Sequence, residues 1–314
     1  MLCFTMTSSG DSPGMMSDET SGPDLDGTVT WGALLAETEA LLRSFGSSDN
    51  PRAEAKWIVE EVTGTVDFDF VDVLETLATV RGVAHLDALV ERRRLGEPIQ
   101  YVLGHWAFRS IDLLVDQRVL IPRPETEVVA GLALVELDRN SEGRGGTVID
   151  LGTGSGAIGL SVATERPGSR VLLTDASRDA LAVARANLAG LGLAARGVEI
   201  AEGSWFDAVP ERYLGEVDVI VSNPPYIGTS EDLASAVRDW EPESALRSGS
   251  DGLDDLRYLV NNAARWLAPN GSLVLEMAPG QTATIAALGS DVGFAASVHA
   301  DLAGLDRAVV LRRA

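Results

Sequence analysis

Apolar residues recur every three or four positions between about residues 28 and 97, which is the spacing of helices with one buried face. One predicted helix, WGALLAETEALLRSFG, ends at Gly46. The next begins at Asn50 as its cap, carries Pro51 in its first turn and ends at Gly64. This pattern predicts a small helical domain over residues 28–97. It contains no cluster of catalytic residue types, so we expect it to recognise a substrate and to take no part in the chemistry.

The spacing changes in the segment YVLGHWAFRSIDLLVDQRVLIPRPETE, where apolar and polar residues alternate and aromatic residues are frequent. Two prolines flank Arg123 at its end. Alternation with period two indicates strands, so we predict a β-hairpin linker over residues 98–124. A new helix is expected to begin near Glu125.

From residue 125 to residue 314, short apolar runs alternate with segments of helical spacing. This order predicts βαβ units and an α/β fold with a doubly wound, mostly parallel sheet. One helix is expected over residues 254–271 and a strand from Ser272. The last two predicted strands follow each other with no room for a helix, so one of them should be antiparallel.

A glycine-rich stretch, VIDLGTGSGA, follows a predicted strand and opens a predicted helix. Gly152, Gly154 and Gly156 allow a tight turn and a close approach of the backbone to a ligand. Asp175 ends the next predicted strand, where a carboxylate can accept hydrogen bonds from ribose hydroxyls. The pair predicts a cofactor that contains adenosine. By itself it leaves open a methyl donor, a dinucleotide, or a structural turn without a ligand.

The run VIVSNPPYIG ends a buried strand on Asn223, Pro224, Pro225 and Tyr226. The side-chain carbonyl of Asn223 and the backbone carbonyl of Pro224 can each accept an N–H, while the prolines fix the backbone and remove donors. The tyrosine ring adds a flat face. These features favour a socket for a planar –NH₂ group. They suit methyl transfer from S-adenosylmethionine to an amide or an exocyclic amine, against the alternative of a strand that merely ends on prolines.

The charge balance narrows the class of partner. The chain has 25 Lys and Arg against 47 Asp and Glu, a net charge of −22, and only a small basic patch at 92–94. Duplex nucleic acid is usually bound by a basic surface, so we expect no direct nucleic-acid partner. The three histidines are scattered without metal-ligand spacing, and we predict no metal site. With a single cysteine, Cys3, no internal disulfide is possible.

Residues 1–27 are rich in Ser, Gly, Asp and Met and are predicted to be a disordered leader, without the features of a signal peptide. No apolar run reaches the length of a membrane span, so we expect no membrane association and a cytoplasmic location. A monomer is the expected state.

The combination of NPPY with DLGTGSGA resembles the amino-methyltransferases, which act on adenine, guanine or glutamine side chains. The linker GEPIQYVLGHWAFRSIDLLVDQRVLIPRPETE, together with GSWFDAV and EPESALRSGSDGLDDLRYLV, resembles the release-factor glutamine methyltransferases. That resemblance spans the chain from about residue 30 to its end. It implies a seven-stranded, Rossmann-like class I methyltransferase sheet, S-adenosylmethionine as cofactor and class-1 peptide-chain release factors as partners. The implied reaction is N5-methylation of the glutamine in their Gly-Gly-Gln loop, in support of translation termination.

The resemblance also implies roles for individual residues. The donor would be held by Gly152, Thr153, Gly154, Ser155, Gly156, Asp175 and Trp205, with Asn223 adjoining it. The glutamine amide would be held by Asn223, Pro224, Pro225 and Tyr226, and Arg123 and Glu125 would belong to the cover of the site. Two departures concern the site: Ser204 stands where the family often has an acidic residue, and Met277-Ala278-Pro279 replaces a glycine-containing segment after Glu276.

Other functions remain to be weighed. A nucleobase amino-methyltransferase would share NPPY, but the acidic charge argues against it. Ribosomal-protein glutamine methyltransferases share the architecture and differ just after Ile-Pro-Arg. An inactive donor-binding module is disfavoured by the intact Asn223 and glycines. A nicotinamide oxidoreductase would need a proton-transfer residue, for which the sequence offers no candidate.

Overall fold

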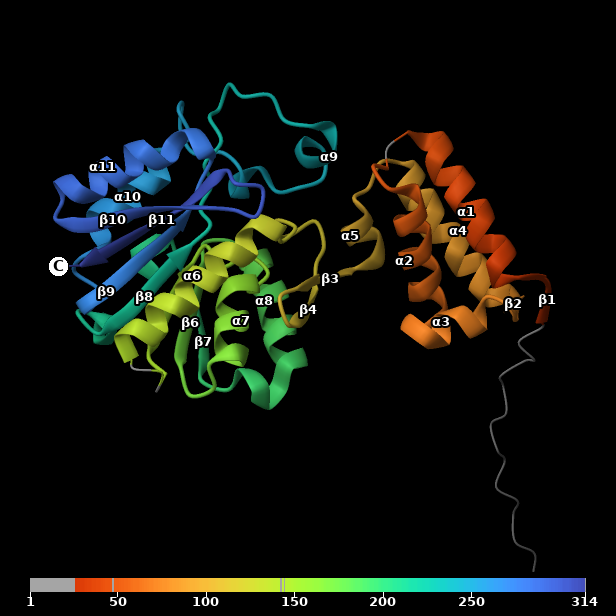
Figure 1. Cartoon of the computed structure of the whole chain (residues 1–314), viewed down its shortest axis with the longest axis horizontal. Coiled ribbons are helices and arrows are strands. Elements are labelled where there is room, and N and C mark those ends of the chain that lie inside the picture. The colour runs from red at the N-terminus through yellow and green to blue at the C-terminus, as the bar shows by residue number, and fades with distance from the viewer. Residues whose placement is uncertain (1–25, 47, 142, 144, 314) are drawn as a thin grey trace, which may run out of the picture. The chain divides into compact units, whose positions relative to one another are not determined.

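The computed structural model describes residues 26–46, 48–141, 143 and 145–313 (Figure 1). Its residues form two compact units, which divide after Glu91. The sequence placed this division at residue 97, with a separate linker from 98 to 124. The predicted leader lies outside the described residues as far as residue 25.

The first unit is built mainly from helices: α1 (Trp31–Phe45), α2 (Pro51–Thr63), α3 (Asp67–Val73) and α4 (Val80–Arg94), the last of which continues past the division. The predicted cap is confirmed, because the side chain of Asn50 accepts a hydrogen bond from the N–H of Ala53. Gly46 and Gly64 end their helices in the left-handed conformation. Leu42 and Ile58 are fully buried. Helical spacing therefore predicted the main elements of this unit.

A short two-stranded sheet in this unit corrects the purely helical prediction. Strand β1 (Asp26–Thr30) pairs antiparallel with β2 (Leu77–Thr79). β2 is only three residues long, which is too short for a period of two to be recognised in the sequence.

The linker region contains the predicted hairpin, β3 (His105–Phe108) and β4 (Ile111–Leu114) in antiparallel pairing. A short helix that the sequence did not predict, α5 (Ile99–Leu103), precedes it. Both belong to the second unit. Arg92 binds this segment, since its guanidinium donates to the carbonyls of Tyr101 and Val102.

The second unit is organised around a seven-stranded sheet of order β10-β11-β9-β8-β5-β6-β7. The strands are β5 (Thr147–Leu151), β6 (Arg170–Asp175), β7 (Val198–Glu202), β8 (Val217–Ser222), β9 (Leu267–Glu276), β10 (Phe294–Ala300) and β11 (Asp306–Arg313). The five strands from β9 to β7 in this order are parallel, and β11 pairs antiparallel with both of its neighbours. The doubly wound, mostly parallel sheet and its antiparallel strand are therefore confirmed.

Helices cover both faces of this sheet (Figure 1). One face carries α6 (Pro124–Ser141), α7 (Ala157–Glu165) and α8 (Arg178–Leu191), and the other carries α10 (Asp254–Ala263) and α11 (Thr282–Asp291). Val148 and Ile149, adjacent on β5, belong to the two different cores. The smaller elements are α9 (Ser235–Arg238) and the 3-10 turns η1 (Gly192–Ala195), η2 (Trp205–Ala208), η3 (Glu211–Tyr213), η4 (Glu243–Ala245) and η5 (Pro279–Gln281).

The boundary between α10 and β9 differs from the prediction. The helix ends at Ala263 and the strand begins at Leu267, whereas the sequence predicted helix as far as residue 271. Leu267 pairs with Val217 and Ser272 with Val219, so the intervening residues bulge from the ladder. Because the pairing is irregular here, residues 267–271 do not alternate between apolar and polar, and their sequence does not predict a strand.

Candidate active site

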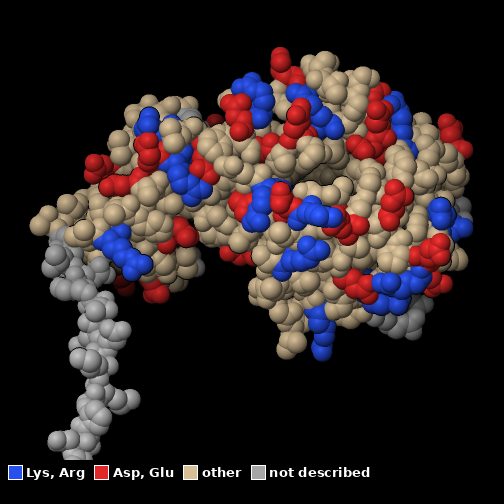
Figure 2. Space-filling model, turned by 180° about the vertical axis from the view of Figure 1, so that it is seen from behind, with Lys and Arg blue, Asp and Glu red and all other residues tan. Residues whose placement is uncertain are grey.

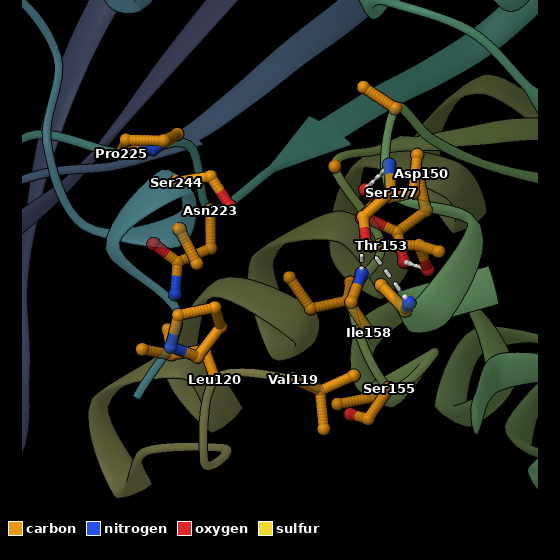
Figure 3. Close-up of a pocket in the computed structure, with 18 of the residues that line it drawn as sticks. Val119, Leu120, Asp150, Thr153, Ser155, Ile158, Ser177, Asn223, Pro225 and Ser244 are labelled. Carbon is orange, nitrogen blue, oxygen red and sulfur yellow. Dashed lines mark hydrogen bonds between the residues drawn. The ribbon is translucent and has the colours of Figure 1, made fainter. Parts of the chain in front are cut away.

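The carboxyl ends of β5, β6 and β8 lie side by side, because β5 sits between the other two in the sheet. The loops that follow these strands surround a cavity of about 430 Å³. Its lining includes eight residues predicted from the sequence: Gly152, Thr153, Gly154, Ser155, Asp175, Trp205, Asn223 and Pro225. Figure 3 shows Asn223, Pro225 and Ser244 facing Thr153, Ser155 and Ile158 across this space. A cavity at this edge of a doubly wound sheet, in this range of volume, is typical of a small-ligand site.

The glycine loop joins β5 to α7 in a conformation that needs its glycines. Gly152 has φ +70°, and a Cβ there would lie 3.2 Å from the ring of Trp205. Gly156 has φ +90° and immediately precedes α7. A side chain at Gly152 would therefore strain the backbone and push the indole away from the loop. Gly156 is not among the lining residues, so its place is in the turn and not at the cavity wall.

The buried carboxylate of Asp150 binds the glycine loop. Asp150 accepts hydrogen bonds from the hydroxyl of Thr153 (2.6 Å) and the N–H of Gly159 (2.9 Å) through Oδ2. Its exposed fraction is only 1%, and burial raises the pKa of its carboxyl to about 6. Asp150 thereby fixes both ends of the turn.

Asp175, at the end of β6, is bound to the same loop. Its Oδ2 accepts from the N–H of Gly154 (2.9 Å), and its Oδ1 accepts from the N–H of Ser177 (2.8 Å). Burial raises the pKa of this carboxyl, against the effect of those backbone donors. A carboxylate has about four acceptor positions, so both oxygens keep capacity for ligand hydroxyls. Asp175 can therefore order the loop and bind a ribose at once.

The indole of Trp205 forms a further part of the wall. Trp205 has φ +47°, an uncommon conformation for a bulky residue, and its Nε1 donates to Oδ1 of Asp255 (2.9 Å). Asp255 belongs to the first turn of α10 and also lines the cavity, as does Ser204. The sequence did not single out Asp255. The acidic DGLDD run was visible, but nothing in it indicated which carboxylate meets the indole.

Asn223 follows β8 directly, and its Nδ2 donates to the hydroxyl of Thr126 (3.3 Å). An amide whose N–H is bound in this way can present its Oδ1 to a ligand. Pro225 also lines the cavity, whereas Pro224 and Tyr226 are not among the lining residues. Tyr226 packs against the core beside α10 and α11, and burial raises the pKa of its phenol to about 12. Its carbonyl accepts from Nε2 of Gln281 (2.8 Å).

Arg123 and Glu125, which were expected from the sequence to cover the site, are sequence neighbours of residues that line the cavity. Arg123 forms an ion pair with Glu241, whose Oε2 also accepts from the N–H of Ile121. Neither Arg123 nor Glu125 lines the cavity, although Pro122 and Thr126 do. The pair ties the start of α6 to the loop after β8.

The segment Met277-Ala278-Pro279, which departs from the family pattern, is held by backbone hydrogen bonds. The N–H of Met277 donates to the carbonyl of Arg307 (3.0 Å), and the N–H of Ala278 donates to Oε1 of Gln281 (3.1 Å). Glu276, just before it, has 1% of its surface exposed at the end of β9. Glu276 and Thr126 are further residues to which the sequence assigned no function.

Charge and composition set limits on the type of ligand. Acidic and basic side chains are interspersed over the face drawn in Figure 2. Among the residues that the structure describes, no group of three or more His, Cys, Asp and Glu could hold a metal ion. Within the same residues, no helix has the length and apolar character needed to cross a bilayer.

Comparisons with known proteins agree with this geometry. Residues 129–240 match the family model of the methyltransferase small domain, and residues 33–104 match that of the PrmC N-terminal domain. The methyltransferase domain implies S-adenosylmethionine as the methyl donor. The glycine loop, the carboxylate of Asp175 and the indole of Trp205, which line the cavity together, are residue types that suit an adenosine-containing ligand.

Three relatives share most of their length with this chain. The release factor glutamine methyltransferase of Agrobacterium fabrum is 36% identical over 91% of this chain and 99% of its own. That of Gloeobacter violaceus is 41% identical over 83% and 91%, respectively. That of Xylella fastidiosa strain Temecula1 is 46% identical over 72% and 80%. The resemblance drawn from the sequence motifs is thus confirmed, and the chain belongs to the release factor glutamine methyltransferases.

Proposed function

We propose that this protein transfers a methyl group from S-adenosylmethionine to the side-chain N5 of the glutamine in the Gly-Gly-Gln loop of class-1 peptide-chain release factors. The observation that carries the proposal is the position of Asn223. It stands beside the glycine loop, and its Nδ2 is bound to Thr126, so its Oδ1 can accept from a substrate amide. Relatives of this chain bear the name of that activity.

Asn223 would act by orienting a weak nucleophile. The lone pair of an amide nitrogen is delocalised, so reaction requires that it be held in line with the methyl carbon. The carbonyls of Asn223 and Pro224 would each accept one N–H of the glutamine –NH₂ group. S-adenosylmethionine supplies an electrophilic methyl group on its sulfonium sulfur. Transfer of this methyl group from the sulfur to the glutamine nitrogen would make that nitrogen acidic, and it would lose its proton to water.

The donor side of the cavity would be formed by the glycine loop, Asp175 and Trp205. Asp175 would bind the ribose, with its carboxylate already held by Gly154 and Ser177. The ring of Trp205 would lie against the adenine. The hydrogen bond from its indole to Asp255 would hold the ring in that position.

The helical domain of residues 28–97 would recognise the release factor. It carries buried helical faces and contributes no residue to the cavity lining. We propose further that the protein acts as a cytoplasmic monomer. Its net charge of −22 gives no support to a direct nucleic-acid partner.

Mass spectrometry tests the activity. A purified class-1 release factor, incubated with this protein and S-adenosylmethionine, should gain 14 Da, about one methyl group, on its Gly-Gly-Gln peptide. A release factor with Gln replaced by Glu in that loop is the substrate control and should gain nothing. Methylation of ribosomal protein or of nucleic acid, without methylation of the release factor, would replace the proposal with one of its alternatives.

A further inference from the structure

We propose that Glu276 is a positioning residue, which acts through the hydroxyl of Thr126 to hold the amide of Asn223 with its oxygen toward the substrate. The charge state of Glu276 would then decide whether the socket accepts an –NH₂ group. The inference deepens the proposed function and rests on it, because it concerns how that site orients a substrate amide.

The three side chains come from elements that meet at one edge of the sheet. Glu276 ends β9, Asn223 follows the adjacent strand β8, and Thr126 lies in the first turn of α6. Glu276 and Thr126 have exposed fractions of 1% and 4%. The Thr126 hydroxyl accepts from Nδ2 of Asn223 (3.3 Å). Burial raises the pKa of Glu276, and hydrogen bonding with the side chain of Thr126 lowers it, so the carboxyl and the hydroxyl interact. Because Glu276 and Thr126 are both buried, a change in the charge of the carboxyl acts strongly on the hydroxyl beside it.

The direction of the hydrogen bonds follows from the chemistry of a hydroxyl. Thr126 has one O–H to donate and two lone pairs to accept with. An ionised Glu276 can only accept, so the Thr126 proton must point to it. The lone pairs that remain on Thr126 then favour the –NH₂ side of the Asn223 amide. Oδ1 of Asn223 is left as an acceptor for the substrate.

Protonation of Glu276 removes this constraint. A neutral carboxyl can donate to Thr126, whose own proton is then free to bond Oδ1 of a rotated Asn223. The amide would present its –NH₂ group to the substrate –NH₂ group, and two donors repel each other. The socket would lose one of its two acceptors.

The surroundings of Glu276 place this change in an accessible pH range. Its Oε2 has no hydrogen-bond partner among the described residues, and burial raises the pKa of the carboxyl to about 7. Glu125, at the start of α6, acts in the same direction as burial. Arg307 of β11 and Arg123 oppose it, as does the bond from Thr126. The phenol of Tyr226 also faces Glu276, and burial raises its pKa to about 12, so it stays neutral over this range.

The test is the pH dependence of single-turnover methylation of a release factor by the full-length protein. The wild-type rate should be about tenfold lower at pH 6 than on its plateau above pH 8, as a group with a pKa near 7 requires. Glu276→Gln keeps an acceptor oxygen and cannot ionise, so its ratio of rates at pH 8 and pH 6 should fall to near one. Thr126→Val should lower the rate about tenfold at pH 8 and also flatten the profile, whereas Thr126→Ser should retain both rate and profile.

Glu136→Gln is the matched control. Glu136 is also buried, with an exposed fraction of 1%, but it pairs with Arg312 and Arg139 away from the cavity lining. Its variant should keep the wild-type pH profile. The dissociation constant for S-adenosylmethionine should stay within about twofold of wild type in all four variants, which separates amide orientation from a general loss of structure.

Two results would overturn the inference: a Glu276→Gln profile as steep as that of wild type, or a Thr126→Val rate equal to that of wild type. Neither result would contradict the proposed function, since the wild-type protein would still methylate the release factor. If wild type failed to do so at any pH, the proposed function itself would fall. The two failures are therefore distinguished by the wild-type rate alone.

Discussion

The indole Nε1 of Trp205 donates a 2.9 Å hydrogen bond to Oδ1 of Asp255, which joins the loop after β7 to the first turn of α10. Trp205 has φ +47°, so its position depends on contacts that compensate an uncommon backbone conformation. Its ring also lies against Gly152, where a Cβ would be 3.2 Å from it. This wall of the cavity is thus shaped by three segments that are distant in sequence.

We expect Asp255→Ala to weaken the binding of S-adenosylmethionine by about 1 kcal/mol, roughly fivefold, because the indole loses its hydrogen-bond partner. Isothermal titration calorimetry measures this. Asp254→Ala is the control, since Asp254 is a neighbouring carboxylate that contacts Arg257 and does not line the cavity. Equal affinities for the Asp255 variant and wild type would show that the indole is held by packing alone.

Asp175→Ala should have a larger effect on the donor. The substitution removes the acceptor proposed for the ribose and also the acceptor of the Gly154 N–H. We expect a loss of roughly 1 to 3 kcal/mol in donor affinity. The same titration with a nicotinamide dinucleotide should show no binding to wild type. Tight dinucleotide binding without a response to S-adenosylmethionine would contradict the donor assignment.

The sequence predicted the place and conformation of the glycine loop well because its signals are local. Glycines at 152, 154 and 156 are required by a turn that only they adopt readily, and that turn has its expected place after β5. Asp175 ends the next strand, so the parallel sheet alone brings it to the loop. The position of Asn223 followed from the same topology, once β8 was expected beside β5.

The residues that the sequence missed depend on contacts between distant segments. Thr126 reads as an ordinary helix residue, and only the fold brings it to Asn223, which is 97 positions away. Asp255 stands among several acidic residues, and its partner is 50 positions away. The strand β2 and the bulged start of β9 were missed for another reason: short or irregular pairing leaves no periodicity to detect.

Asn223→Ala tests the amide socket directly. Removal of one oriented acceptor should lower single-turnover methylation by about a hundredfold to a thousandfold, by analogy with the loss of one donor from an oxyanion hole. Donor affinity should change much less. Asn223→Asp should stay impaired, because its charge would be attracted to the sulfonium and compete with orientation of the amide. The exposed Asn261, which bonds within α10, supplies the control variant Asn261→Ala.

A near-normal rate for Asn223→Ala would mean that the glutamine amide is held elsewhere. Retention of full donor affinity by the same variant would exclude unfolding as the reason for a slow rate. The two measurements together therefore separate the socket from the donor site.

The helical domain can be removed to test its role in recognition. A shortened chain should begin at Glu91, because Arg92 donates to the carbonyls of Tyr101 and Val102 and pairs with Glu97. A cut at Ile99 would remove these contacts. We expect the shortened chain to bind S-adenosylmethionine as the full chain does but to methylate a release factor at least tenfold more slowly at limiting substrate. Equal rates would show that the domain does not recognise the substrate.

Glu276 should also make the stability of the protein depend on pH. Its folded-state pKa of about 7 lies above its ordinary value of 4.5, so the unfolded chain ionises first as pH rises. The contribution of Glu276 to the free energy of unfolding is therefore fully present below about pH 4.5 and is lost as pH rises through about 7. The loss at pH 8 can reach about 3 kcal/mol, at about 1.4 kcal/mol for each pKa unit.

Glu276→Gln cannot ionise and should escape this loss. Its free energy of unfolding in urea should match that of wild type at pH 4.5 and exceed it by about 1 to 3 kcal/mol at pH 8. Asp150, whose pKa burial raises to about 6, is present in both proteins and cancels in the difference. Glu136→Gln should show the opposite sign. Burial acts to raise the pKa of Glu136, but hydrogen bonds and the charge of Arg312 outweigh it and lower the pKa to about 2, so the variant should be less stable than wild type at pH 8. If the difference between Glu276→Gln and wild type were the same at both pH values, the folded-state pKa of Glu276 would equal its ordinary value of 4.5. Glu276 would then be ionised from pH 6 to pH 8, and the pH dependence proposed for its action on Asn223 would have no source.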